Sequence, residues 1–180
     1  HEDTIFYIAG DGSERQHLEG RIRQEGINNV RLLPFLPRAE YFNLVNSSDA
    51  SFVSLDERMK APCLPGKIIN LMACSQPIIA IVAKESDTAD VIRKAECGIV
   101  VKPGDIARIR SAILHLKDNA PAREVMGNNS RRYLERNMSL EKNVSLYEEI
   151  FYKLAGNGVL VRKPVSSRSE DATGVEYREL

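Results

Sequence analysis

The residues of this sequence that are best suited to chemistry are Pro65, Gly66 and Lys67. They stand between a loop and an apolar segment of helical character, so Gly66 and Lys67 are expected in the opening turn of a helix. A helix start offers unpaired backbone N–H groups and about half a positive charge, and the lysine adds a full one. The pattern therefore predicts a phosphate-binding site. A plain helix start with a solvated Lys67 is the alternative that these residues leave open.

Two other loops could contribute to such a site, because each follows an apolar, strand-like segment. The first contains Gly10 and Gly12, which allow a tight turn and close approach of the backbone to a ligand, although a simple strand-to-helix turn has the same composition. The second, residues 34–38, is stiffened by two prolines, and a rigid loop suits recognition of a flat ring because little entropy is lost on binding. Open α/β sheets bind ligands where such loops lie, at the carboxyl ends of the strands.

The elements that must position these loops follow from hydrophobic periodicity. Short apolar, β-branched segments alternate with longer helical segments up to residue 101, and only helical segments follow. The pattern predicts an α/β fold: a Rossmann-like parallel sheet with helices on both faces, followed by C-terminal helices. The predicted strands are Ile5–Ala9, Val30–Leu33, Ala50–Leu55, Pro77–Val82 and Gly98–Val101. The predicted helices are Arg15–Glu25, Ala39–Ser47, Lys67–Cys74, Thr88–Ala95, Ile106–Leu116, Ala122–Arg136 and one that begins after Ser139.

We expect one domain over residues 1–155 and a flexible tail over residues 156–180, where periodicity fades and Ser, Arg and Glu dominate. In the first helix, Arg15 and its charged neighbours are expected to face water or to pair with one another. Lys+Arg and Asp+Glu both number 25, so the formal net charge of +0 provides no overall field for nucleic acid or an anionic membrane. Any anion site must be local.

The cysteines and histidines of the sequence give little support for a metal site or for redox chemistry. Cys63, Cys74 and Cys97 are an odd number at spacings unlike a zinc site, and we interpret them as reduced residues of a cytosolic protein. His17 and His115 have no second ligand at metal-binding spacing. No apolar segment is long enough to cross a bilayer, and the first residues have no signal-peptide pattern.

Five blocks of sequence, in this order and spacing, resemble the C-terminal domain of the retaining GT-B glycosyltransferases, in particular the large bacterial family that builds polysaccharides. The blocks are Phe6–Glu14, Asn29–Pro37, Ser48–Leu55, Asn70–Ala80 and Cys97–Asp105, within a resemblance that covers about residues 4–151. In that family this domain binds a nucleoside-diphosphate sugar. The resemblance implies that the backbone near Leu36 and Arg38 faces the base, that Gly66 and Lys67 face the diphosphate, and that Asn70 stands where a carboxylate usually holds the ribose.

The implied reaction moves a sugar from the donor, with UDP preferred over GDP, to a growing glycan or lipid-linked acceptor, with retained configuration. The resemblance assigns no catalytic residue, metal or cofactor to this chain. Most members place two glutamates eight positions apart, where this sequence has Pro62 and Asn70. One capsule and O-antigen branch instead begins the helix with Pro-Ser-Lys, which Pro65-Gly66-Lys67 resembles. Asp56 and Glu57, just before this site, are expected to be solvated loop acids.

Family members also have an N-terminal domain that holds the acceptor, and a first strand of this domain that is central to the sheet. Neither precedes His1, so we expect a fragment or one part of a split enzyme that does not transfer sugar alone. The resemblance places it in the cytoplasm and leaves open a contact with the inner face of the membrane through the other domain. The alternative is a non-catalytic nucleotide-sugar-binding or scaffold subunit of the same fold. An epimerase and an NAD-binding protein are less favoured, because a carboxylate pair and the third glycine of the dinucleotide motif are lacking.

Overall fold

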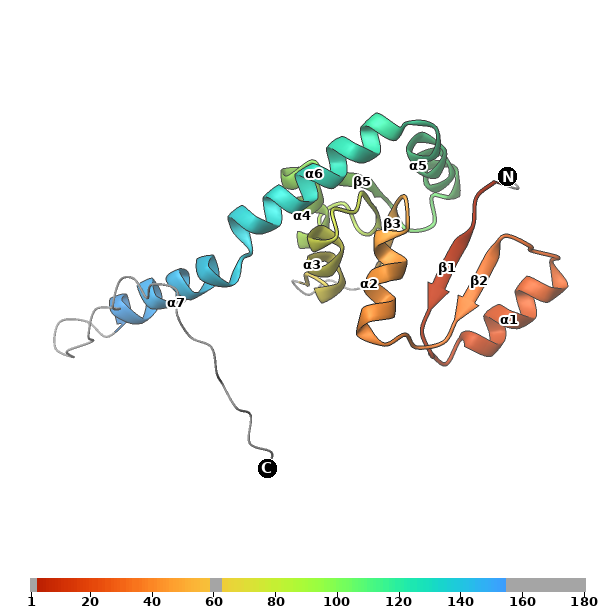
Figure 1. Ribbon diagram of the computed structural model, residues 1–180, viewed down its shortest axis with the longest axis horizontal. Coiled ribbons are helices and arrows are strands. Elements are labelled where there is room, and N and C mark those ends of the chain that lie inside the picture. Colours follow the sequence, from red (N-terminus) through yellow and green to blue (C-terminus); the bar gives the residue numbers. More distant parts are fainter. Residues whose placement is uncertain (1–2, 59–62, 155–180) are drawn as a thin grey trace, which may run out of the picture. The chain divides into compact units, whose positions relative to one another are not determined.

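The structure is a computed structural model that describes residues 3–58 and 63–154. Pro62 and the expected tail, residues 156–180, therefore lie outside the described residues. The chain divides into two units, residues 1–139 and 140–180, and each is described by itself. The first unit contains all five described strands and six of the helices, and the second contains the helix Leu140–Leu154 (Figure 1).

The five strands form where the sequence predicts them, and every described pair is parallel. They are β1 (Phe6–Ala9), β2 (Val30–Leu33), β3 (Ser51–Ser54), β4 (Ile78–Ile81) and β5 (Gly98–Val101). β1 pairs with β2 in one sheet, and β4 lies between β3 and β5 in the other. The predicted fold class, a parallel α/β architecture flanked by helices, is confirmed, with its strands in two sheets.

The helices also begin and end within about two residues of the predicted bounds. They are α1 (Arg15–Gln24), α2 (Arg38–Asn46), α3 (Gly66–Ala73), α4 (Asp87–Ala95), α5 (Ile106–Asp118), α6 (Ala120–Asn137) and α7 (Leu140–Leu154). Side-chain caps fix several starts: Ser86 Oγ accepts from the Ala89 amide at the start of α4, and Asp105 accepts from the Arg108 amide at the start of α5.

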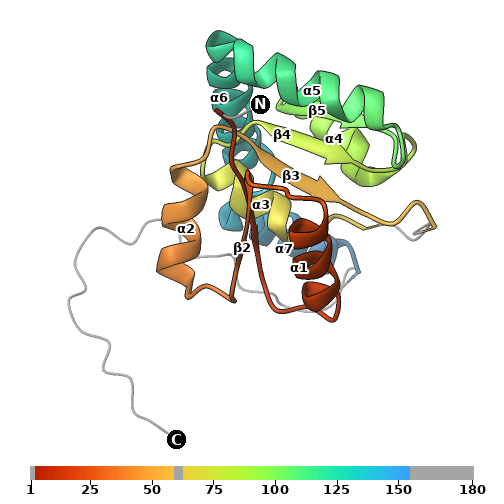
Figure 2. The same cartoon turned by 90° about the vertical axis from the view of Figure 1, so that its right-hand side faces the viewer.

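The three-stranded sheet is covered on both faces. On one face, buried residues of β3 and β4 pack with the apolar sides of α3 and α4, including Val53, Ile68, Met72 and Ile92. On the other face, Ile79 and Val101 pack with Ala112 and Leu116 of α5. Figure 2 shows α3 and α5 on opposite sides of these strands. A strand buried on both faces must be apolar at successive positions, which explains the Ile-Ile-Ala-Ile sequence of β4.

Two buried polar groups fix the turn between α3 and β4. Gln76 accepts from Ser51 Oγ at 3.0 Å and donates through its Nε2 to the Ser48 carbonyl at 3.2 Å. Ser130 Oγ on α6 donates to the Gln76 carbonyl at 2.7 Å. Each of these buried polar groups has a hydrogen-bond partner, so none is left unsatisfied. Together they fix the path of the chain from α3 into β4.

The second unit is a single helix, α7, with apolar residues on much of its surface. Val144, Ile150 and Leu154 are exposed within this unit, and the rings of Tyr147 and Phe151 stack with centroids 6.5 Å apart. Residues at this spacing share one side of a helix.

The three cysteines are free, as expected. Cys97, which leads into β5, is fully buried, and this burial raises the pKa of its thiol to about 11. It is therefore protonated and unreactive at neutral pH.

The close approach of β4 and β5 depends on Gly98, because a Cβ added there would overlap the carbonyl oxygen of Ile78. We expect Gly98→Ala to lower the free energy of unfolding by at least about 2 kcal/mol in denaturant titrations. The matched control is Gly20→Ala in α1, where nothing lies within 4 Å of an added Cβ. That change should stabilise the chain by about 0.5–1 kcal/mol. Equal effects of the two substitutions would contradict this account of Gly98.

Candidate functional site

The three loops singled out in the sequence all follow the carboxyl ends of strands. Gly10 and Gly12 follow β1, Leu36 follows β2, and the loop that ends at Pro65 follows β3. This is the edge at which parallel α/β sheets bind ligands. The predicted position of each loop relative to its strand is correct.

The third loop ends in an open helix start. Pro65 precedes α3 in an extended conformation (φ −59°, ψ 133°), and its carbonyl accepts from the Ile68 amide at 2.9 Å. Among the described residues, none accepts a hydrogen bond from the amides of Gly66 and Lys67, and no side chain caps them. Two N–H donors at the positive end of a helix are therefore available to an anion from solvent.

The body of α3 is rigid although its start is open. Ile68 and Met72 are fully buried and Leu71 is nearly so, in the core beneath the helix. The loop before the helix is also held, because Thr88 Oγ1 of α4 donates to the Cys63 carbonyl at 3.0 Å. An anion at Gly66 would thus meet donors whose positions are already fixed, which reduces the entropy lost on binding.

Lys67 and Asn70 are both exposed and lie three residues apart, so they share one side of α3. No ion pair of Lys67 is found with any described residue. The amino group can therefore move toward a ligand without breaking an existing contact. Asn70 can both donate and accept, although its bonds to a hydroxyl are weaker than those of a carboxylate.

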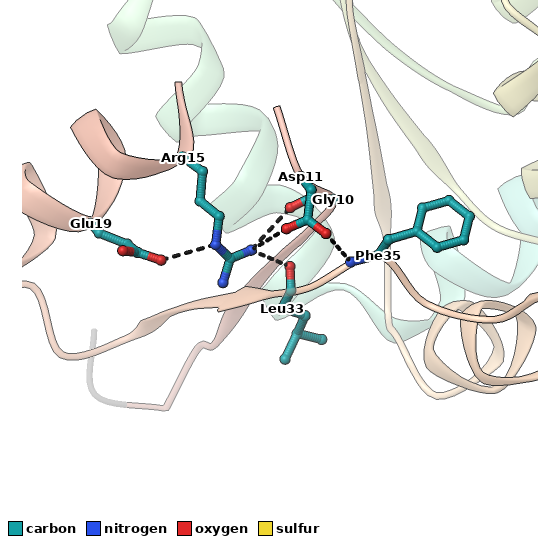
Figure 3. A network of polar contacts seen from close by, with 6 residues as sticks. All are labelled: Gly10, Asp11, Arg15, Glu19, Leu33 and Phe35. Atoms are coloured by element: carbon teal, nitrogen blue, oxygen red, sulfur yellow. Dashed lines mark hydrogen bonds and ion pairs between the residues drawn. The ribbon is translucent and has the colours of Figure 1, made fainter. Parts of the chain in front are cut away.

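The first two loops are joined through Arg15 (Figure 3). Its Nη1 donates to the carbonyl oxygens of Leu33, at 2.8 Å, and Gly10, at 3.0 Å, and its Nε lies 3.0 Å from a carboxylate oxygen of Glu19. Gly10 has a φ of +144°, a conformation that favours glycine, and its amide donates to the Leu33 carbonyl at 3.1 Å. The end of β2 and the loop after β1 thus form one hydrogen-bonded unit.

Asp11 makes the second connection between these loops. One of its oxygens lies 3.4 Å from the Arg15 guanidinium, and the other accepts from the Phe35 amide at 3.2 Å. The Phe35 ring is 76% exposed, whereas Leu36 beside it is half-buried. The guanidinium of Arg38, at the start of α2, lies 5.6 Å from the centre of the Phe42 ring.

Sequence reasoning missed Arg15, which was expected only to face water or pair along its helix. It does pair with Glu19, but it is half-buried and also holds two carbonyls from separate strands. The signal in the sequence was the arginine placed three residues after Gly12, at the start of a helix. That position alone could not indicate the Leu33 carbonyl, which is 18 residues away.

The acids before the third loop are paired with nearby cations. Arg58 lies 2.6 Å from Asp56 and holds the pKa of that carboxyl well below its usual value. Glu57 lies 3.1 Å from Lys102, which follows β5. Both acids are exposed, in agreement with the expectation of solvated loop residues. In the described part of the chain, no group of three His, Cys, Asp or Glu side chains could hold a metal ion.

The structure joins the candidate residues in two groups. Gly10 and Leu36 belong to loops that hydrogen bonds hold together, and Arg38 begins α2 directly after the second of them. Pro65–Lys67 and Asn70 belong to α3 and the loop before it. Within residues 3–58 and 63–154, no hydrogen bond or ion pair connects the two groups directly. Within the same residues, no helix is sufficiently long and apolar to span a bilayer.

Solved structures of GT-B glycosyltransferases share the fold of this chain over part of their length. Anabaena HepE in complex with UDP aligns with 84% of this chain and 41% of its own, with a TM-score of 0.66 and 19% identity. A variant of TarM from S. aureus, solved with Fondaparinux, alpha-GlcNAc-glycerol and UDP, aligns with 82% of this chain and 29% of its own, with a TM-score of 0.68 and 17% identity.

The family of this chain is identified by sequence comparison. Residues 1–133 match the family "Glycosyl transferases group 1", and the chain belongs to it. An uncharacterized glycosyltransferase of Methanocaldococcus jannaschii, MJ1069, is 23% identical over 153 residues, which are 85% of this chain and 38% of that protein. The chain therefore spans well under half the length of these relatives. Membership supports a glycosyltransferase role, as the resemblance in the sequence predicts.

The joining role of Arg15 can be tested by Arg15→Ala. Loss of two charge-assisted hydrogen bonds to carbonyls should lower the free energy of unfolding by about 1–2 kcal/mol. It should also speed hydrogen exchange of the Gly10 amide, which donates to Leu33, by about tenfold.

The matched control is Arg21→Ala on the same helix. Arg21 is exposed, and among the residues that the structure describes its one ion-pair partner is Glu25, so its loss should cost less than about 0.5 kcal/mol. If Arg15→Ala left both the stability and the Gly10 exchange rate at the control level, Arg15 would not hold the loops together.

Proposed function

We propose that this chain is the donor-binding domain of a retaining glycosyltransferase that uses a nucleoside-diphosphate sugar. The observation that carries the proposal is the open start of α3, where the amides of Gly66 and Lys67 have no described acceptor. Together with the Lys67 ammonium they provide a positive site at the carboxyl end of β3. A diphosphate is a suitable ligand because its negative charge is attracted by both the positive helix start and the Lys67 ammonium.

The loops after β1 and β2 would hold the nucleoside. The unit formed by Gly10, Asp11 and Arg15 holds the Phe35 amide, directly before Leu36, so backbone groups near Leu36 and Arg38 could contact a base at low entropic cost. Gly12 leaves open space beside this loop, since no atom lies within 4 Å of an added Cβ. UDP is preferred over GDP, because HepE and TarM were both solved with UDP.

In the transfer reaction, the bond between the anomeric carbon and the β-phosphate oxygen breaks and the acceptor oxygen takes its place with retained configuration. Negative charge grows on the departing diphosphate, and fixed amides with a nearby cation lower the barrier by stabilising it. Gly66 and Lys67 would therefore act on the leaving group. No residue of this chain is assigned as the acid, base or nucleophile.

The acceptor is proposed to be a growing glycan or a lipid-linked sugar, held by a second domain. Relatives such as MJ1069 are more than twice as long as the matched segment, which leaves room for such a domain. The chain is then expected to bind the donor in the cytoplasm without transferring sugar by itself. Any contact with the inner face of the membrane would involve the second domain.

The second candidate function is a non-catalytic nucleotide-sugar-binding or scaffold subunit. It is favoured by Asn70, which is uncharged at the position where the resemblance implies a ribose-binding carboxylate. The two functions differ in one measurement. Sugar transfer by the complete gene product supports the enzyme, whereas donor binding without transfer or donor hydrolysis supports the subunit.

The donor site can be tested with Lys67→Ala by calorimetry with UDP and with uridine. If the ammonium contacts the diphosphate, UDP should bind about tenfold more weakly while uridine binding is unchanged. Lys94→Ala is the control, because Lys94 is an exposed lysine in the last turn of α4, at the opposite end of a helix. It should leave both affinities unaltered.

An equal loss of affinity for UDP and uridine would remove Lys67 from the phosphate. A first screen with UDP, GDP, ADP and NAD by thermal shift establishes the class of ligand. Stabilisation by NAD alone, or by none of the four, would overturn the donor site.

A further inference from the structure

Three consecutive side chains of α6 donate hydrogen bonds to the backbone of other segments, and α6 lies beside both α3 and α4 (Figure 1). The three acceptors are carbonyls in the turns where α3 and α4 end and the chain passes into β4 and β5. One helix therefore holds the carboxyl ends of two others. The bonds run from Asn129 Nδ2 to the Glu96 carbonyl at 3.1 Å, from Ser130 Oγ to the Gln76 carbonyl at 2.7 Å, and from Arg131 Nη1 to the Ala73 carbonyl at 2.7 Å.

Both of these turns contain a residue in the left-handed conformation. Ser75 after α3 has a φ of +53° and Glu96 after α4 has a φ of +49°, and no other non-glycine residue that the structure describes has a positive φ. This conformation is unfavourable for residues with a side chain and persists where surrounding contacts hold it. α6 makes such contacts: beside the hydrogen bond to Glu96, a Cβ added to Gly127 would overlap the carbonyl oxygen of Ser75. The α6 cluster consists of Gly127, Asn129, Ser130 and Arg131.

The other ends of α3 and α4 meet at the candidate site. α3 begins at Gly66, whose amide is open, and Thr88 near the start of α4 donates to the Cys63 carbonyl in the loop that leads to Gly66. α3 has eight residues, so it is about 12 Å long. The α6 cluster and the open helix start therefore belong to the two ends of one short helix.

Two kinds of contact hold α3 in different directions. Ile68, Leu71 and Met72 keep the helix against the core, but apolar contacts are non-directional and resist a small shift along the helix axis only weakly. The hydrogen bond from Arg131 to the last residue of α3 is directional, so it fixes the position along that axis. A helix of two turns contains no joint, so a shift of its last carbonyl reaches its first amides.

We propose that Arg131 is a positioning residue of the donor site. With the rest of the α6 cluster it sets how far the amides of Gly66 and Lys67 reach toward a bound diphosphate, although it does not touch the ligand itself. Glu135, one turn further along α6, pairs with the Arg131 guanidinium and so limits its rotation. The inference rests on the proposed function, because the ligand that it concerns is the diphosphate of the donor.

The test is calorimetry of Arg131→Ala with UDP and with uridine, at a temperature at which circular dichroism shows the variant to be folded. UDP should bind about fivefold more weakly, because displaced amides lose part of their bonds to the diphosphate. Uridine, which the loops after β1 and β2 would hold, should lose no more than about twofold. Arg131→Lys retains a cation that can reach the last carbonyl of α3, so its UDP affinity should lie within about twofold of that of the unchanged chain.

Two matched controls separate positioning from charge and from stability. Arg132→Ala removes the same charge from the neighbouring exposed residue of α6. Asn129→Ala removes a hydrogen bond of the same cluster, but one that ends at α4. Both variants should bind UDP within about twofold of the unchanged chain. If Arg131→Ala does not fold, Arg131→Gln takes its place, since its side chain is too short to reach the Ala73 carbonyl.

Two results would overturn the positioning role. One is a lower melting temperature for Arg131→Ala with an unchanged affinity for UDP, which would make the hydrogen bond purely structural. The other is an equal loss of affinity for UDP and uridine, or a failure of Arg131→Lys to restore UDP binding. Absence of UDP binding by the unchanged chain is a separate outcome, which would overturn the donor site and the role of Arg131 with it.

Discussion

The burial of β4 on both faces is the constraint on which the rest of the described structure depends. Its isoleucines separate two layers of side chains, one shared with α3 and α4 and the other with α5. Burying apolar surface at about 25 cal/mol per Å² is the main favourable contribution available to such a small domain. This burial fixes the position of β4. The helices that pack on β4 are fixed with it, and their polar ends are held in place.

The candidate site uses this rigidity in two different ways. At α3, apolar residues hold the helix while its first amides remain open, so a fixed positive end meets solvent. At β1 and β2, a guanidinium and a carboxylate hold the loops with hydrogen bonds, because these short, partly exposed strands provide little apolar cover. The donor proposal needs both, since a nucleoside diphosphate has a flat ring at one end and a charged group at the other.

Much of the architecture could be predicted from the sequence, for identifiable reasons. Val30–Leu33 and Gly98–Val101 were predicted at their observed bounds, because apolar β-branched residues between turn signals leave few alternatives. The loops at Gly10, Leu36 and Gly66 were correctly placed after strands because parallel sheets put all such loops at one edge.

The rest could not be predicted, because it depends on residues that are distant in sequence. The contact of Arg15 with the Leu33 carbonyl exists only once β1 and β2 pair. The exposure of Tyr7 and Ile8 contradicts what the apolar sequence of β1 suggests, because burial depends on which neighbours are present and not on the strand alone. The roles of Gly66, Lys67 and Asn70 in binding stay predictions.

The buried position of Cys97 makes its thiol a natural probe of local opening of the core. The thiol lies between α4 and β5, in contact with the buried cluster, and its Sγ is 3.8 Å from the Ile92 carbonyl. A thiol that is both enclosed and protonated reacts with an alkylating reagent only when the surrounding layer separates. The rate of Cys97 labelling, measured by mass spectrometry, would therefore follow how often this layer opens and would need no introduced probe.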